Sequence, residues 1–219
     1  MQTVNISQVM QTNLEQQIRC NTDSGEWERI MPFIAEDLRI ENIDFDPVNL
    51  PEILAKAYTG DVVGGKGLCL MGYVGSGKSH RMEFFSRKTH IKMLSAPEIC
   101  AEWVQMGGNN AITEFMAYLR ADGHEEVYGG NVPQFYCDLI IDDLGTENER
   151  YSSYGIESDV MVQYVIPFRY KVFPKWKTYF TTNLTKQKLK DRYGDRCYSR
   201  LNEMCAFIPL THKDRRMAE

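Results

Sequence analysis

The sequence predicts an α/β fold in which helices flank a parallel sheet of five strands, and two observations support this prediction. First, the apolar run 68–71 is followed by Gly-Tyr-Val-Gly-Ser-Gly-Lys-Ser at 72–79 and then by a helical pattern. Second, apolar runs of strand length alternate with helical patterns over the rest of the chain, as helical crossovers between parallel strands require. The predicted strands are 68–71, 91–95, 135–141, 177–181 and 207–210. The predicted helices are 79–88, 97–106, 111–121, 157–173 and 186–204.

The first 45 residues are predicted to form a helical segment distinct from this core. Apolar residues recur at helical spacing over 6–18 and again over 27–34, where Pro32 could interrupt the second helix. A third helix is predicted over 50–58. We place a soft boundary near residue 45, so that 1–45 are available to a partner and 46–219 form the core.

Residues 72–79 match G-x-x-x-x-G-K-S, the pattern of a loop that binds nucleotide phosphates. Its glycines allow the backbone N–H groups to surround an anion, and the helix that follows adds the positive end of its dipole. The pattern predicts that Lys78 contacts the β- and γ-phosphates of ATP and that Ser79 ligates Mg²⁺. The predicted nucleotide-binding residues are Gly72, Val74, Gly75, Ser76, Gly77, Lys78, Ser79 and His80.

Polar residues follow two later strands. Asp142 and Asp143 end the apolar run that begins at residue 135, and Asn183 ends the run 177–181. Polar residues at the carboxyl ends of parallel strands meet at one edge of the sheet. We expect Asp142 to hold Mg²⁺, Asp143 to orient or deprotonate the attacking water, and Asn183 to hydrogen-bond that water or the γ-phosphate. Glu147 is a second candidate for polarising the water.

Two arginines follow in the segment Gly-Asp-Arg-Cys-Tyr-Ser-Arg-Leu at 194–201. An arginine that reaches the γ-phosphate of a neighbouring protomer would neutralise charge in the transition state. Arg200 and Arg196 are therefore the candidates for a residue that acts in trans.

These segments together resemble the DnaC/IstB group of AAA+ ATPases, which contains bacterial replicative-helicase loaders and transposition helper ATPases. The resemblance covers roughly residues 60–205. Its most specific parts are Asp-Asp-Leu-Gly-Thr-Glu at 142–147 and Ser-Arg-Leu at 199–201. The other matching segments are 72–80, Arg-Tyr at 169–170, Thr-Thr-Asn-Leu-Thr at 181–185, and the start of 192–201.

The resemblance implies an AAA+ type P-loop NTPase without a separate C-terminal lid, which hydrolyses ATP with Mg²⁺ and forms homo-oligomers on ATP and DNA binding. It implies that Asn183 is the sensor and that Arg200 is the arginine finger, with Arg196 beside it. A helicase loader would act on single-stranded DNA with a replicative helicase. A transposition helper would act on duplex DNA with a transposase.

Composition agrees with a protein that has neither membrane nor secretory features. The chain has 43% apolar and 25% charged residues, no long apolar run, and six scattered cysteines without a C-x-x-C pair, so we expect a cytoplasmic protein with reduced thiols. Its net charge of −5 excludes attraction to nucleic acid by the whole surface. Lys186, Lys188, Lys190 and Arg192 form a local basic stretch, which is either a DNA contact or a solvated face.

Two functions of other classes remain open at this stage. A P-loop kinase would phosphorylate a small molecule, but it needs an acceptor pocket and a mobile basic lid, whereas the order of motifs here points away from one. A nucleotide-gated switch would bind ATP with negligible hydrolysis, and the adjacent carboxylates argue mildly against it. ATP turnover without an added acceptor would separate an ATPase from a kinase.

Overall fold

The computed structural model describes residues 26–40, 50–59, 65–111, 138–173 and 175–210, and the chain divides into two compact units, 1–63 and 64–219. In the first unit, α2 (Glu26–Ile40) packs on α3 (Leu50–Thr59). The helix α2 continues through Pro32, because its buried residues Ile30, Ile34 and Leu38 lie along one face and offset the lost backbone hydrogen bond. The helix predicted over 6–18 and the boundary near residue 45 lie outside the described residues.

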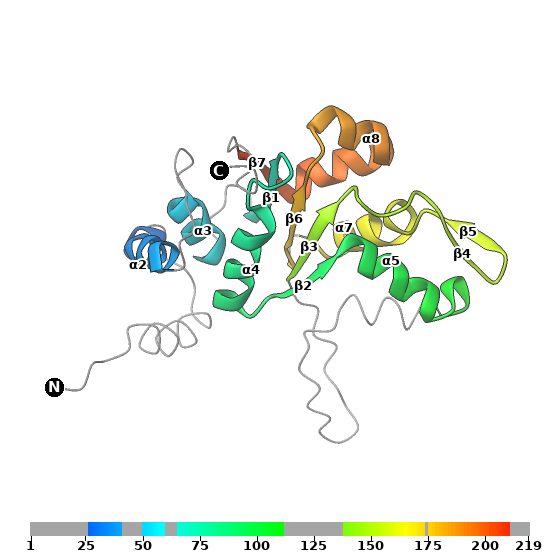
Figure 1. The fold of residues 1–219 in the computed structure, drawn as a ribbon, viewed down its shortest axis with the longest axis horizontal. Helices are drawn as coiled ribbons and strands as arrows, with labels where there is room; N and C mark the ends of the chain where they lie inside the picture. Colours follow the sequence, from blue (N-terminus) through cyan, green and yellow to red (C-terminus); the bar gives the residue numbers. More distant parts are fainter. Residues whose placement is uncertain (1–25, 41–49, 60–64, 112–137, 174, 211–219) are drawn as a thin grey trace, which may run out of the picture. The chain divides into compact units, whose positions relative to one another are not determined.

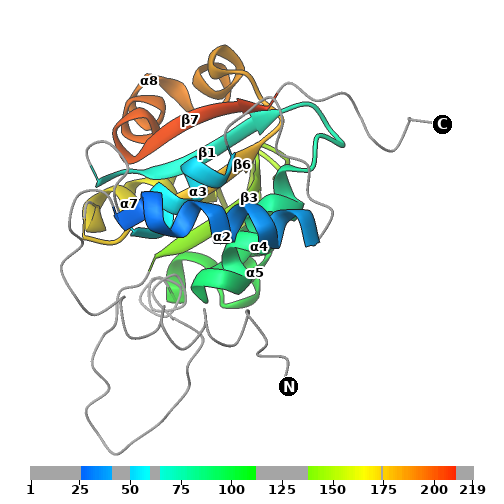
Figure 2. The ribbon, with the colours of Figure 1, turned by 90° about the vertical axis from the view of Figure 1, so that its left-hand side faces the viewer.

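The second unit holds a parallel sheet of five strands among its described residues (Figures 1 and 2). The strand order is β2-β3-β6-β1-β7, so β1 lies between β6 and β7. All five predicted strands are confirmed, with shifted ends. Their bounds are β1 (Gly67–Gly72), β2 (Lys92–Ser95), β3 (Leu139–Leu144), β6 (Thr178–Thr182) and β7 (Cys205–Leu210).

Helices connect these strands, and local sequence sets their ends. Ser95 begins α5 with a capping box, in which its side chain accepts a bond from the Glu98 N–H and the Glu98 carboxylate accepts one from the Ser95 N–H. Gly194 has non-helical backbone angles (φ 74°, ψ 165°) and breaks α8 into two pieces. The helical elements are α4 (Lys78–Thr89), α5 (Ala96–Gln105), η2 (Gly108–Ala111), η3 (Met161–Val165), α7 (Ile166–Val172) and α8 (Lys186–Met204). Most of the helix predicted over 111–121 lies outside the described residues.

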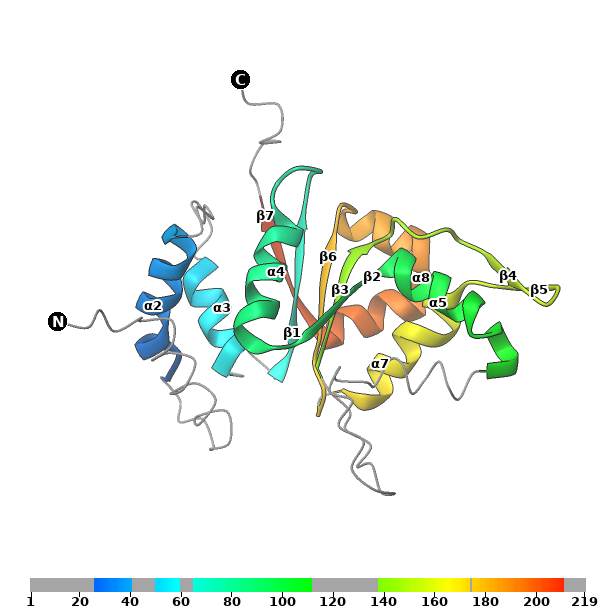
Figure 3. The ribbon, with the colours of Figure 1, turned by 60° about the horizontal axis from the view of Figure 1, so that its bottom comes forward.

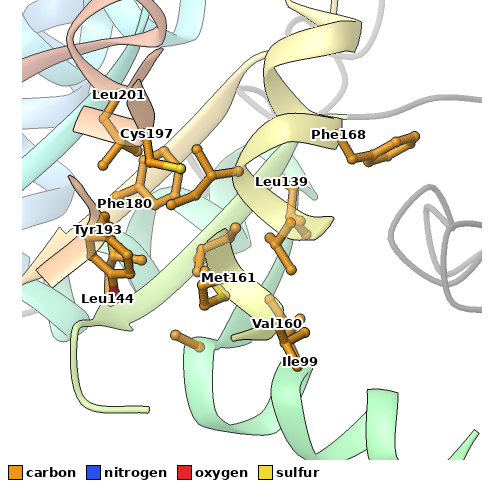
Figure 4. Packing of buried hydrophobic residues seen from close by; sticks show 14 of the residues in the cluster. Ile99, Leu139, Leu144, Val160, Met161, Phe168, Phe180, Tyr193, Cys197 and Leu201 are labelled. Atoms are coloured by element: carbon orange, nitrogen blue, oxygen red, sulfur yellow. The ribbon is translucent and has the colours of Figure 1, made fainter. Parts of the chain in front are cut away.

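The inner strands β3, β6 and β1 are largely buried on both faces, as the continuous apolar runs predict, whereas the edge strands β2 and β7 are less buried. On one face, Tyr179 of β6 meets Phe85 of α4 with ring centroids 5.1 Å apart. On the other face, Leu139 and Phe180 pack in one cluster with residues of α5, α7 and α8, of which Figure 4 shows a part. Figure 3 shows α4 on one side of the sheet and α5, α7 and α8 on the other.

The helix predicted over 157–173 begins later than expected, because a small hairpin precedes it. Strands β4 (Tyr151–Ser153) and β5 (Ile156–Ser158) pair antiparallel around Tyr154 and Gly155. Both turn residues have positive φ (50° and 76°), as a tight two-residue hairpin turn requires. The helical path therefore starts only at η3. None of the helices in the described ranges is long and apolar enough to span a membrane.

Candidate nucleotide site

The Gly72–Ser79 loop lies between β1 and α4, as predicted. Gly75 and Gly77 have φ values of 79° and 78°, which side chains with a Cβ rarely adopt. A Cβ at Gly72 would lie 2.7 Å from the backbone oxygen of Leu210, so the end of β1 has no room for a side chain. The loop therefore exposes its backbone at the N-terminus of a helix, where anions bind.

Lys78 is buried within this loop, with 4% of its surface exposed. Its ammonium donates to the carbonyl oxygens of Gly72 (3.0 Å) and Tyr73 (2.8 Å) and to Oδ1 of Asn183 (2.6 Å). Burial lowers the pKa of Lys78, while the nearby Asp143 and Asp142 act to raise it. The loop lysine and the predicted sensor, which are far apart in the sequence, thus touch directly.

The two predicted acids lie in a β-bulge. The pairing between β3 and β6 shifts between Ile141 and Leu144, so that Asp142 and Asp143 both lie opposite Thr181. The Thr181 hydroxyl donates to Oδ1 of Asp142 and accepts a 2.9 Å bond from the Asp143 N–H. Asp143 has a φ of 54°, a left-handed conformation that turns its side chain away from the regular strand direction. One buried hydroxyl therefore holds the Asp142 carboxylate and the Asp143 backbone.

Asn183 follows β6 directly, and the neighbouring backbone is tied to β3. The Thr182 hydroxyl donates to the Leu144 oxygen (2.6 Å) and accepts from the Leu184 N–H (3.1 Å). The loop after β1, the acids of β3 and the amide of β6 thus converge at the carboxyl edge of adjacent strands, where ligands bind in open α/β sheets.

Glu147 differs from Asp142 and Asp143 in its hydrogen bonds. Its carboxylate is fully buried, and both oxygens accept hydrogen bonds from the protein. Oε2 accepts from the Gly145 N–H (2.8 Å), while Oε1 accepts from the Tyr193 hydroxyl (2.6 Å) and the Arg192 guanidinium (3.1 Å). This geometry favours a structural role, in which Glu147 connects Gly145 to Tyr193 and Arg192, over the predicted role of polarising water.

Arg196 and Arg200 lie on the second piece of α8, which runs toward the edge of the sheet opposite the loop. Arg196 is exposed, and the Arg200 guanidinium lies 5.2 Å from the centroid of the Tyr170 ring. The helix α8 ends beside Cys205, which pairs with Gly67 at the start of β1, whereas the phosphate loop follows Gly72 at the other end. Five steps of a strand separate these ends by about 17 Å.

The predicted basic stretch is divided by the structure. Lys186, Lys188 and Lys190 are exposed, and Lys190 forms a 2.8 Å ion pair with Asp195. Arg192 is instead mostly buried between two carboxylates, with 11% of its side chain exposed. Three lysines and not four cations therefore remain for contact with a polyanion. His80 is exposed and lies 3.6 Å from Glu83.

Sequence reasoning missed two residues that hold the site in place. Arg81 is buried, and its guanidinium donates to the backbone oxygen of Ser76 inside the loop. Thr181 carries the bulge described above. Their signals are weak, because an arginine one turn after the loop lysine and a threonine inside an apolar strand occur in many proteins.

The residues present fit ATP and Mg²⁺. Ser79 and Asp142 offer hard oxygen atoms, and Mg²⁺ is usually held by one or two carboxylates together with phosphates and waters. Within the described residues there is no group of three or more His, Cys, Asp or Glu side chains that would form a closed metal site. A site of the open kind, in which the nucleotide completes the coordination, agrees with this set of donors.

Solved structures with a similar fold include the DnaC helicase loader, with 22% identity and a TM-score of 0.44 over 68% of this chain and 80% of that chain. A candidate primosome component from Streptococcus pyogenes serotype M3 has 20% identity and a TM-score of 0.50, over 75% of this chain and 78% of that chain. No protein-family model and no curated protein matches the chain. The second likeness supports the predicted fold class, an α/β P-loop core with a five-stranded parallel sheet. At this identity it establishes the fold alone.

Proposed function

We propose that this chain is an ATPase that binds Mg²⁺–ATP at the loop 72–79 and assembles on DNA as a helicase loader of the DnaC type. The observation that carries the proposal is the 2.6 Å contact between Lys78 and Asn183, beside the bulge that holds Asp142 and Asp143. A chance glycine-rich turn would not bring a buried lysine, two acids and a polar sensor to one edge of a sheet.

Each of these residues has a distinct role in the proposed reaction. Lys78 and the backbone N–H groups of the loop bind the phosphates, and Ser79 with Asp142 holds Mg²⁺, which neutralises charge on the phosphates when bound. Asp143 orients or deprotonates the attacking water, and Asn183 hydrogen-bonds the same water or the γ-phosphate. Arg200 reaches the site of a neighbouring protomer.

The role in replication rests on the motifs that resemble the DnaC/IstB group, above all 142–147 and 199–201. The fold shared with a candidate primosome component agrees with that resemblance. A transposition helper is the second candidate from the same group. The small-molecule kinase is less favoured, because Asp143 and Asn183 suit activation of a water molecule beside the phosphates.

ATP turnover without any acceptor tests the nucleotide chemistry. We expect Lys78→Ala to abolish turnover and to weaken ATP binding by about 10- to 150-fold, since a hydrogen bond to a charged group contributes about 1.5–3 kcal/mol. Arg87→Ala, an exposed cation near the far end of the same helix, should retain both activities. Normal hydrolysis by Lys78→Ala would refute the proposed site.

Binding of a labelled single-stranded oligonucleotide and of a duplex, with and without a non-hydrolysable ATP analogue, tests the DNA part. We expect ATP-dependent binding that prefers the single strand; preference for the duplex would favour the transposition helper. Replacing Lys186, Lys188 and Lys190 by Gln should lower the slope of log K against log salt by about 0.7 for each lost contact. An unchanged slope would exclude these lysines as the contact surface.

A further inference from the structure

A buried ionic network joins the turn after Asp143 to the helix α8. Glu147 lies between the two, with the Gly145 N–H on one oxygen and the Tyr193 hydroxyl and Arg192 on the other. Arg192 also donates to Oδ2 of Asp159 at 2.6 Å. Burial favours the neutral form of the Tyr193 phenol and, with the charge of Glu147, raises its pKa, so this hydroxyl stays a donor to the carboxylate.

At one end, the network is hydrogen-bonded to the segment that follows Asp143, the proposed water-orienting acid. Gly145 is two residues after Asp143, has a φ of 98°, and packs against the side chain of Leu184. The backbone oxygen of Asp143 accepts two bonds from Thr146, one from its N–H and one from its hydroxyl. Glu147 thus holds, through the Gly145 N–H, the turn that directly follows Asp143.

At the other end, the network holds α8 immediately before its break at Gly194. Tyr193 is 3% exposed and belongs to the same cluster as Leu144 at the end of β3, beside which Figure 4 shows it. The helical piece after the break carries Arg196 and Arg200. The first piece of α8 therefore contacts the segment after Asp143 through Arg192 and Tyr193. The second piece begins at Gly194, directly after these two residues.

We propose that Glu147, Arg192 and Tyr193 are positioning residues, which couple the orientation of Asp143 to the placement of the helix that carries Arg200. This inference rests on the proposed ATPase function, but it assigns Glu147 a task other than activating water. A general base needs a free oxygen within reach of the water. Glu147 has donors from the protein on both oxygens and no exposed side-chain surface.

A double-mutant cycle on ATP turnover tests the assignment. Tyr193→Phe keeps the ring and removes one donor, and Glu147→Gln keeps the shape and removes the charge. We expect each variant to lower kcat by about 10- to 100-fold, as loss of partners that orient a site typically does. The affinity for ATP should not change, because the loop 72–79 is untouched. The double variant should be little worse than the worse single variant, since both remove the same connection.

Tyr164→Phe is the matched control, because it also deletes a tyrosine hydroxyl, here one bonded to Asn109 near the surface. Its kcat should equal that of the unmodified chain. If Glu147→Gln loses activity while Tyr193→Phe does not, Glu147 acts as the base and the positioning role is wrong. Additive losses in the double variant would equally overturn it.

Amide hydrogen exchange without nucleotide tests the coupling between the Asp143 segment and α8 without relying on catalysis. Either substitution should speed exchange in both 139–148 and 186–204, because each segment loses its fixed partner. Faster exchange confined to the substituted segment would refute the coupling. Absence of ATP turnover in the unmodified chain would refute the proposed function instead, and the exchange result would still stand.

Discussion

Replacing Thr181 by Val tests whether one hydroxyl holds the Asp142 carboxylate and the Asp143 backbone in place. Valine has nearly the same shape as threonine but lacks the hydroxyl, so at this fully buried position the change removes hydrogen bonds and not volume. The change removes the donor to Asp142 and leaves the Asp143 N–H without its acceptor. Loss of a partner of a buried polar group costs about 1–3 kcal/mol. For a core of this size, that cost corresponds to a fall in Tm of about 2–12 °C.

Thermal unfolding and ATP turnover measure the two consequences separately. We expect kcat to fall by about 10- to 100-fold together with the fall in Tm, since partners that orient metal-binding carboxylates have effects of this size. Thr146→Val is the control for the stability measurement only, because its hydroxyl bond to the Asp143 oxygen is exposed and its loss should cost under about 0.5 kcal/mol. A Thr181→Val protein with unchanged Tm and kcat would refute the account of the bulge.

Three further results are expected. Asp143→Asn should bind ATP normally but hydrolyse it about 10²- to 10⁴-fold more slowly, measured by phosphate release, and normal turnover would assign the water to another group. Arg200→Ala should lose about 10³- to 10⁵-fold in kcat and regain activity when mixed with Lys78→Ala, whereas an inactive mixture with proven co-assembly would exclude action in trans. Gly145→Ala should lower Tm and kcat together, because its φ of 98° disfavours alanine and a Cβ would meet Leu184; unchanged values would show that the turn adapts.

The sequence predicts the sheet well because its inner strands are largely buried on both faces. The run 68–71 is apolar throughout, and the G-x-x-x-x-G-K-S pattern identifies it as the strand that carries the phosphate loop. Polar residues directly after such strands had to lie at the carboxyl edge of the sheet. The meeting of Lys78 with Asn183 follows from that rule, once β1 and β6 are adjacent.

The remaining features depend on contacts that have no local signature. The bulge at Asp142 and Asp143 exists because β3 and β6 pair with an offset, and neither strand alone specifies it. The hairpin 151–158 was predicted as helix in part, since its Tyr-Gly turn is a weaker signal than Asn-Gly. Arg192 looked like a surface cation because charge alone gives no information on burial, and only the fold brings it between Glu147 and Asp159.

The position of Arg200 on α8 bears on whether the proposed ATPase acts as an oligomer. The register of β1 with β7 places the end of α8 beside Gly67, at the edge of the sheet opposite the phosphate loop. Arg200 lies four residues before this end of α8, and the strand β1 spans about 17 Å between Gly67 and the start of the loop. Its guanidinium rests on the Tyr170 ring, whose hydroxyl donates to Glu203, so it is held in a defined place. If Arg200 stabilises a transition state, we expect the phosphate that it contacts to belong to a neighbouring protomer, and hydrolysis would then depend on the oligomer.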